Sequence, residues 1–80
     1  MNTTAKTDQT AKIAESWRRI AQEDLGVEAG GAMIYAIGSE LAVLRLFHAY
    51  RNDPNAHDAA WSPARGAWVF TLQRRFDRLG

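Results

Sequence analysis

A short apolar segment between glycines divides the chain and decides between two fold classes. Residues 32–37 (AMIYAI) follow Gly30-Gly31 and precede Gly38. β-Branched and aromatic residues favour a buried strand in such a run. With helices on both sides, a strand here predicts an α+β domain. The alternative is one helix over residues 32–51, interrupted near Gly38, which would make the protein mostly helical.

Helical periodicity precedes this segment. Ile13, Trp17 and Ile20 recur at the spacing that places apolar side chains on one face of a helix. We expect this helix over residues 8–25. Residues 1–7 lack apolar periodicity and are expected to form a flexible tail before a single globular domain over residues 8–80.

A second helix is expected after Ser39, whose hydroxyl suits an N-cap. Its sequence is apolar on more than one side, which is typical of a helix in the centre of a core or in an interface. If the sheet covers only one side, a second apolar stripe stays exposed as a patch for a partner or a second copy, and a homodimer becomes possible. We expect this possible oligomer patch to contain Val43, Leu46, Phe47 and Tyr50.

The last part of the chain predicts a β-hairpin. A short strand over residues 57–61 and an alternating strand over residues 67–73 flank turn chemistry at residues 62–66. Trp61 and Trp68 can then meet across the hairpin. The predicted architecture is helix–strand–helix–β-hairpin, with a short antiparallel sheet packed against two helices.

Composition excludes several classes of protein. The chain has no cysteine, so disulfides, thiolate zinc sites, iron–sulfur clusters and cysteine nucleophiles are excluded. No apolar run approaches the ~20 residues that span a bilayer, and the start lacks the apolar core of a signal peptide. We therefore expect a cytoplasmic protein with no membrane partner.

No motif indicates catalysis, a metal or a cofactor. The glycine pair lacks the Gly-Lys-Ser/Thr ending of a phosphate-binding loop. Ser39, His57 and an aspartate at position 53 or 58 supply the residue types of a catalytic triad, but no nucleophile-elbow pattern surrounds Ser39. The two histidines lack the spacing of metal ligands. A chain of 80 residues also needs its few large side chains for one core, so we expect a binding module rather than an enzyme.

Charge differs between the two halves of the chain. Residues 1–40 carry four basic and six acidic side chains, whereas residues 41–80 carry six arginines and three aspartates. Arginine favours bidentate or stacked contacts. Eight arginines against two lysines, with fourteen alanines, also fit the codon bias of a GC-rich bacterial, phage or plasmid genome.

These features favour a small non-enzymatic protein that binds a larger protein or nucleoprotein complex. An inhibitor or adaptor encoded by a phage or plasmid, of the anti-CRISPR or antidefence type, is one concrete form. Arginine and tryptophan dominate interface hot spots. The expected partner-binding residues are Arg51, Trp61, Arg65, Trp68, Arg74 and Arg75.

The alternative is a small nucleic-acid-binding regulator that uses the same arginine-rich half. Aromatic side chains on a sheet beside arginines bind single strands in several protein classes. Against this, Trp68, Phe70 and Leu72 share one face of the last strand and are needed for the core of so small a domain.

Overall fold

The described part of the computed structural model consists of two helices and one antiparallel sheet. The structure describes residues 2–73, with residues 2–9 as backbone only. The strand order in the sheet is β1-β2-β4-β3, and every neighbouring pair is antiparallel. The elements are α1 (Asn2–Ala21), β1 (Gly26–Gly30), β2 (Met33–Gly38), α2 (Glu40–Ala49), β3 (Ala60–Ser62) and β4 (Ala67–Gln73).

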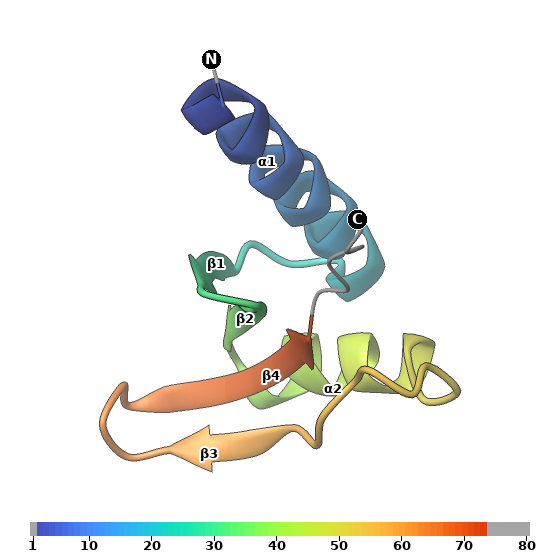
Figure 1. Ribbon diagram of the computed structural model, residues 1–80. Coiled ribbons are helices and arrows are strands. Elements are labelled where there is room, and N and C mark those ends of the chain that lie inside the picture. The colour runs from blue at the N-terminus through green and yellow to red at the C-terminus, as the bar shows by residue number, and fades with distance from the viewer. Residues whose placement is uncertain (1, 74–80) are drawn as a thin grey trace.

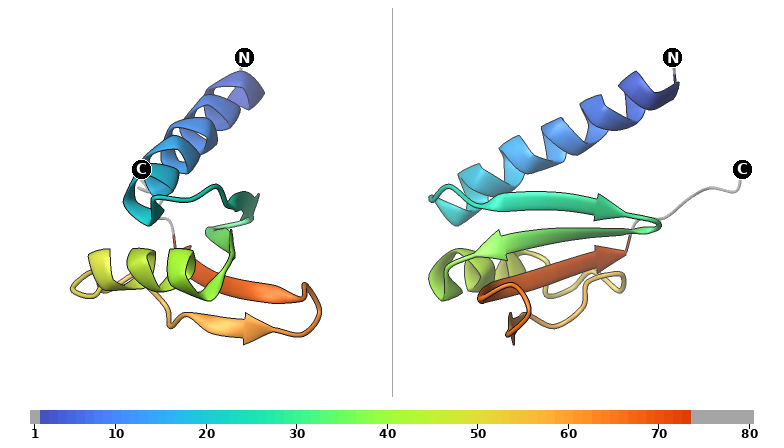
Figure 2. Two further views of the ribbon diagram at one scale, coloured as in Figure 1. Left: turned by 180° about the vertical axis from the view of Figure 1, so that it is seen from behind. Right: turned by 90° about the vertical axis from the view of Figure 1, so that its left-hand side faces the viewer.

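Both helices lie on the same side of the sheet. α2 packs against β2 and β4, while α1 packs against α2 and β1. α1 diverges from the sheet towards its N-terminus, so that its first turns stand away from the other elements (Figure 1). Seen from the other side, the sheet faces the viewer with no helix in front of it (Figure 2, right). Within residues 2–73 the domain therefore has two layers, and neither α1 nor α2 covers the second face of the sheet.

The predicted α+β class is confirmed. Residues 33–38 form strand β2, so the alternative of a single interrupted helix over residues 32–51 is wrong. β4 covers residues 67–73 as expected. The expected strand at residues 57–61 begins later, at Ala60, although Ala56 already forms an isolated bridge to Leu72.

The bounds of the first helix differ from the prediction. α1 begins at Asn2, so residues 2–7 continue the helix rather than precede it. It ends at Ala21 because Gln22 takes a left-handed conformation, with φ of 59°. The chain then turns so that the buried Leu25 side chain reaches the core.

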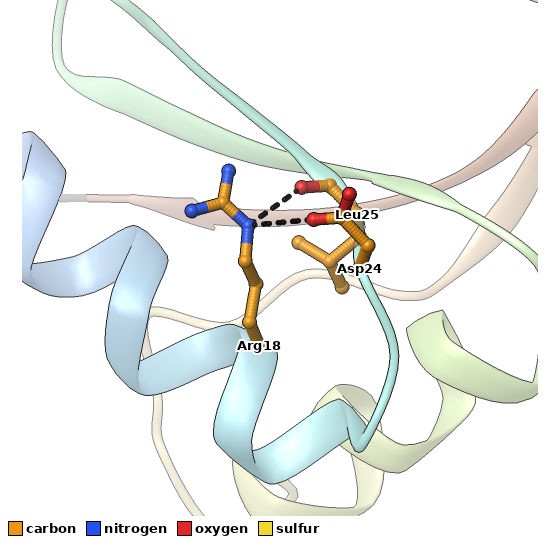
Figure 3. Close-up of polar contacts among 3 residues, drawn as sticks. All are labelled: Arg18, Asp24 and Leu25. Carbon is orange, nitrogen blue, oxygen red and sulfur yellow. Dashed lines mark hydrogen bonds and ion pairs between the residues drawn. The ribbon is translucent and has the colours of Figure 1, made fainter.

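Arg18 holds this turn together. Its Nε donates to the backbone carbonyl of Leu25 at 3.1 Å and lies 3.2 Å from the carboxylate of Asp24 (Figure 3). Both contacts join the last turn of α1 to the segment that leads into β1. Gly26 is the first residue of that strand.

Strand β1 was not predicted from the sequence. It pairs with β2 from Gly26↔Ile37 to Gly30↔Met33, and a two-residue turn connects the strands. Gly31, the first residue of that turn, has a φ of 59°, which glycine adopts without strain. The paired glycines thus mark a hairpin, although residues 26–30 have low intrinsic strand propensity.

The start of α2 agrees with the prediction. The Ser39 hydroxyl accepts a hydrogen bond from the backbone N–H of Ala42 at 3.1 Å, which is N-cap geometry. The same hydroxyl donates to Oε1 of Glu23 at 2.8 Å. The cap therefore also connects α2 to the segment that follows α1.

Trp17 lies at the centre of the core. Its side chain is fully buried, and its indole N–H donates to the hydroxyl of Tyr50 at 2.9 Å. Its ring meets the rings of Tyr50 and Phe70 edge-on, with centroids 6.1 and 5.6 Å away. One side chain of α1 therefore contacts both the end of α2 and the central strand β4.

We expect Gln22→Gly to stabilise the protein. Glycine adopts the left-handed conformation at this exposed position without the cost that a side chain pays. The free energy of unfolding should rise by about 0.5–1 kcal/mol in urea titrations followed by circular dichroism. Gln22→Val should lower the free energy of unfolding. If both substitutions lower it, the left-handed conformation at the end of α1 is contradicted.

Removal of the Tyr50 hydroxyl tests the hydrogen bond between Tyr50 and Trp17. Tyr50→Phe keeps the ring but leaves the buried indole N–H without its acceptor, and we expect a loss of about 1–2 kcal/mol in the free energy of unfolding. Tyr35→Phe is the matched control, because the Tyr35 hydroxyl has no hydrogen-bond partner among residues 2–73. Equal losses in the two variants would remove this hydrogen bond from the stability of the core.

Candidate functional site

The possible oligomer patch on the second helix is corrected by the structure. Val43 and Leu46 are fully buried, while Phe47 and Tyr50 are half-buried and pack against the core. The reason is that α1 and β4 both pack on this side of α2. These four residues therefore form part of the core or pack against it.

The other apolar stripe of α2 is the exposed one. Leu41 is 53% exposed and Leu44 39% exposed, and both belong to the first half of the helix. His48 continues this stripe and is also exposed. The sequence shows that this helix is apolar on more than one side, but it does not show which side faces the core.

The two tryptophans of the hairpin meet as predicted. Trp61 in β3 pairs directly with Trp68 in β4. Trp68 is half-buried against the core, whereas Trp61 is 53% exposed because β3 is at the edge of the sheet, beyond the strands that α2 covers. The prediction that the Trp68 side of β4 faces the core is confirmed, since Phe70 is fully buried.

Strand register places the exposed leucines at the same end of the domain as Trp61. Gly38 pairs with Trp68, which pairs with Trp61, so the three form one row across the sheet. α2 begins at Glu40, immediately beyond this row. Both α2 and the Trp61 side chain are on the same side of the sheet. We call the exposed group Leu41, Leu44 and Trp61 the Trp61 surface.

Arg65 lies in the turn between β3 and β4 and reaches over the other side of the sheet. Its Nη1 is 2.9 Å from Oε1 of Glu28 in β1, and its guanidinium is 5.7 Å from the centre of the Tyr35 ring. Gly66, with φ of 62°, closes the turn. Arg65 thus ties the tip of the hairpin to β1 and β2, and its charge is already paired.

Among the remaining predicted arginines, Arg51 is described by the structure and lies after α2, away from β3 in the sequence of elements. Arg51 is exposed just after α2, where its Nη1 donates to the carbonyl of His48 at 2.9 Å. Arg74 and Arg75 lie outside the described residues. Among the four predicted partner-binding residues that the structure describes, Trp61 and Trp68 are directly paired across the hairpin.

A second surface escaped the sequence reasoning. The face of the sheet opposite the helices carries half-buried side chains that do not contribute to the core cluster. We call this the open face. It consists mainly of Met33, Tyr35, Ile37, Val69 and Thr71, with Glu28 at its β1 edge. The signal was present in residues 33–38, where apolar residues occupy both faces of one strand.

Within residues 2–73, no three His, Asp or Glu side chains gather in a way that could hold a metal ion. Ser39 is engaged as a helix cap, so its hydroxyl has a structural role. Neither helix has the length and apolar character required to cross a membrane within that same range.

Comparison with known proteins gives no relative from which a function can be carried over. No family model, curated protein or solved structure matches the chain. The functional argument therefore depends on the surfaces described above.

The two tryptophans of the hairpin should differ in their effect on stability. Trp61→Ala removes an exposed side chain and should change the free energy of unfolding by less than about 1 kcal/mol. Trp68→Ala opens part of the core and should cost about 2–3 kcal/mol. Acrylamide quenching adds a direct readout, since Trp61→Phe should remove the most accessible fluorescence. Equal destabilisation by both alanine variants would contradict the exposure of Trp61.

Proposed function

We propose that this protein is a non-enzymatic protein–protein interaction module that binds a larger partner through the Trp61 surface. The observation that carries the proposal is the 53% exposure of Trp61 at the edge of the sheet. A domain with so small a core gains most of its stability from burying large side chains. A tryptophan kept at the surface is therefore better explained by a partner than by folding.

The composition of the Trp61 surface supports a protein partner. Leu41 and Leu44 add apolar area at the same end of the domain, and Trp68 is the direct partner of Trp61 on the neighbouring strand. Interface hot spots combine an aromatic anchor with surrounding apolar contacts that exclude water. A complementary partner would offer an apolar pocket for the indole.

Nucleic-acid binding through the arginine-rich half is less well supported. Phe70, one of the aromatic residues of β4, is fully buried and has no ring face available for a base. Arg65 forms an ion pair with Glu28, and the Nη1 of Arg45 donates to the carbonyl of Ala21 at 2.8 Å. These two guanidinium groups are therefore already engaged within the protein, whereas phosphate binding requires accessible positive charge.

An inhibitor or adaptor role of the antidefence type remains the more specific form of this proposal. It depends on chain length and on the arginine- and alanine-rich composition. Under this form the partner is a component of a larger machine, and the chain acts by occupying a site on it. Arg51, Arg74 and Arg75 would then supplement the apolar contacts around Trp61.

A comparison of bait variants tests the proposal. The full chain is immobilised and exposed to an extract of the organism that encodes it. The proteins that it retains are compared with the proteins retained by the immobilised variants Trp61→Ala and Lys12→Ala. Lys12 is an exposed control position on α1. A true partner should be retained by wild type and Lys12→Ala. Loss of the tryptophan anchor should weaken its binding by about 2 kcal/mol or more, roughly thirtyfold.

The salt dependence of partner retention distinguishes protein binding from nucleic-acid binding. Contact through a mostly apolar surface should change little between 50 and 200 mM salt, whereas binding through six or more phosphates should weaken by about a thousandfold. Undiminished retention by Trp61→Ala would contradict the proposed surface. Steep loss with salt, together with recovered DNA or RNA, would support the nucleic-acid alternative instead.

A further inference from the structure

The exposed stripe of α2 is apolar in its middle and charged at its two ends. Leu41, Leu44 and His48 follow one another at spacings of three and four residues, which place side chains on one face of a helix. Glu40 lies at the start of this stripe, Arg51 lies just beyond its end, and both are exposed. The stripe therefore has an acidic end and a basic end.

Glu40 and Arg51 carry charges that no ion pair within residues 10–73 neutralises. The ion pairs in that range are those of Arg18 and Arg65, and they involve neither end of the stripe. The Nη1 of Arg51 donates to the carbonyl of His48, which holds the guanidinium over the last turn of α2. Both end charges are therefore available to a surface that carries opposite charges in the reverse order.

A second copy of α2 that runs in the opposite direction presents this reverse order. We propose that two copies of this chain associate through the stripe, with their α2 helices antiparallel and a two-fold axis close to Leu44. Leu41 of one copy then faces His48 of the second copy, because these positions flank the middle of the stripe symmetrically.

The same register brings the end charges together. Glu40 and Arg51 are eleven residues apart, which is about three helical turns, so they lie on the same flank of the stripe. In antiparallel helices related by a two-fold axis, each flank meets the same flank of the other helix. Side chains lean towards the N-terminus of a helix, and this lean brings Glu40 level with Arg51 of the second copy. The two-fold symmetry makes this contact twice.

The remaining charge near the middle of α2 is directed away from the stripe. The Nη1 of Arg45 donates to the carbonyl of Ala21 at 2.8 Å, so its guanidinium is turned towards α1. A purely acidic or purely basic peptide would match one end of the stripe and oppose a like charge at the other. A second copy matches both ends at once.

The size of the stripe predicts weak association. α2 has ten residues and is about 15 Å long. A contact of this size belongs with transient interfaces, which bury less than about 1,200 Å² in total. Because Leu41 and Leu44 also belong to the Trp61 surface, the dimer competes with the larger partner for this site, a consequence that rests on the proposed function.

Charge reversal tests the antiparallel register. Glu40→Arg alone and Arg51→Glu alone each oppose like charges at both ends of the dimer, so each should associate at least about tenfold more weakly than the wild type. An equimolar mixture of the two variants restores opposite charges at both ends and should associate like the wild type. Sedimentation equilibrium between about 20 µM and 1 mM measures these associations, and circular dichroism reports whether each variant is folded.

Lys12→Glu is the matched control for net charge. It changes the net charge by the same amount as Arg51→Glu, but at an exposed position on α1. Lys12→Glu alone should associate like the wild type, and its mixture with Glu40→Arg should associate more weakly than the mixture of Glu40→Arg with Arg51→Glu. Equal association in the two mixtures would show attraction by net charge and overturn the register.

The absence of cysteine permits a direct test of the axis. In Leu44→Cys the two new thiols lie close to each other across the axis, so mild oxidation should give a disulfide-linked dimer on non-reducing gels. Ala11→Cys, at an exposed position on α1, should give much less. Equal cross-linking of the two variants, or a wild type that stays monomeric at about 1 mM, would overturn the dimer.

Failure of the dimer is distinguishable from failure of the proposed function. The charge-reversal mixtures contain this chain alone, whereas the Trp61→Ala bait measures the larger partner. A monomeric wild type overturns the dimer and leaves the partner site as proposed. Undiminished partner retention by Trp61→Ala overturns the partner site and leaves the dimer.

Discussion

The burial of Trp17 is the interaction on which the rest of the fold depends. This side chain fills the space where α1, α2 and β4 meet, and its hydrogen bond to Tyr50 satisfies its polar atom. The ring of Tyr50 also contacts Phe70, with centroids 5.6 Å apart, so the three aromatics form a closed triangle. Trp17 is the largest side chain that α1 buries in the core.

Much of the fold could be predicted from local sequence signals. Residues 67–73 alternate regularly, and Ser39 has the residue type and position of a cap, so β4 and the start of α2 were placed correctly. Trp61 and Trp68 meet because the turn residues between them specify a hairpin. In each case the determining interaction is short in range and visible in the order of residues.

The errors concern interactions between distant segments. α1 ends at Ala21 because Gln22 takes a left-handed conformation, and Arg18 then holds the chain where Leu25 enters the core; no periodicity in residues 8–25 reveals this. β1 forms because β2 offers it an edge, despite its glycines. Which apolar side of α2 is buried depends on where α1 packs against it. The exposure of Trp61, which carries the proposed site, likewise depends on β3 being the outermost strand.

The strand order β1-β2-β4-β3 also has a consequence for how the chain folds. Each outer strand pairs with its neighbour through a short turn, whereas the central β2–β4 ladder joins segments separated by all of α2 and the loop after it. Closing that long loop costs entropy before any central pairing is gained. We therefore expect the two hairpins to form before the central ladder, and the pairing of β2 with β4 to limit the rate of folding.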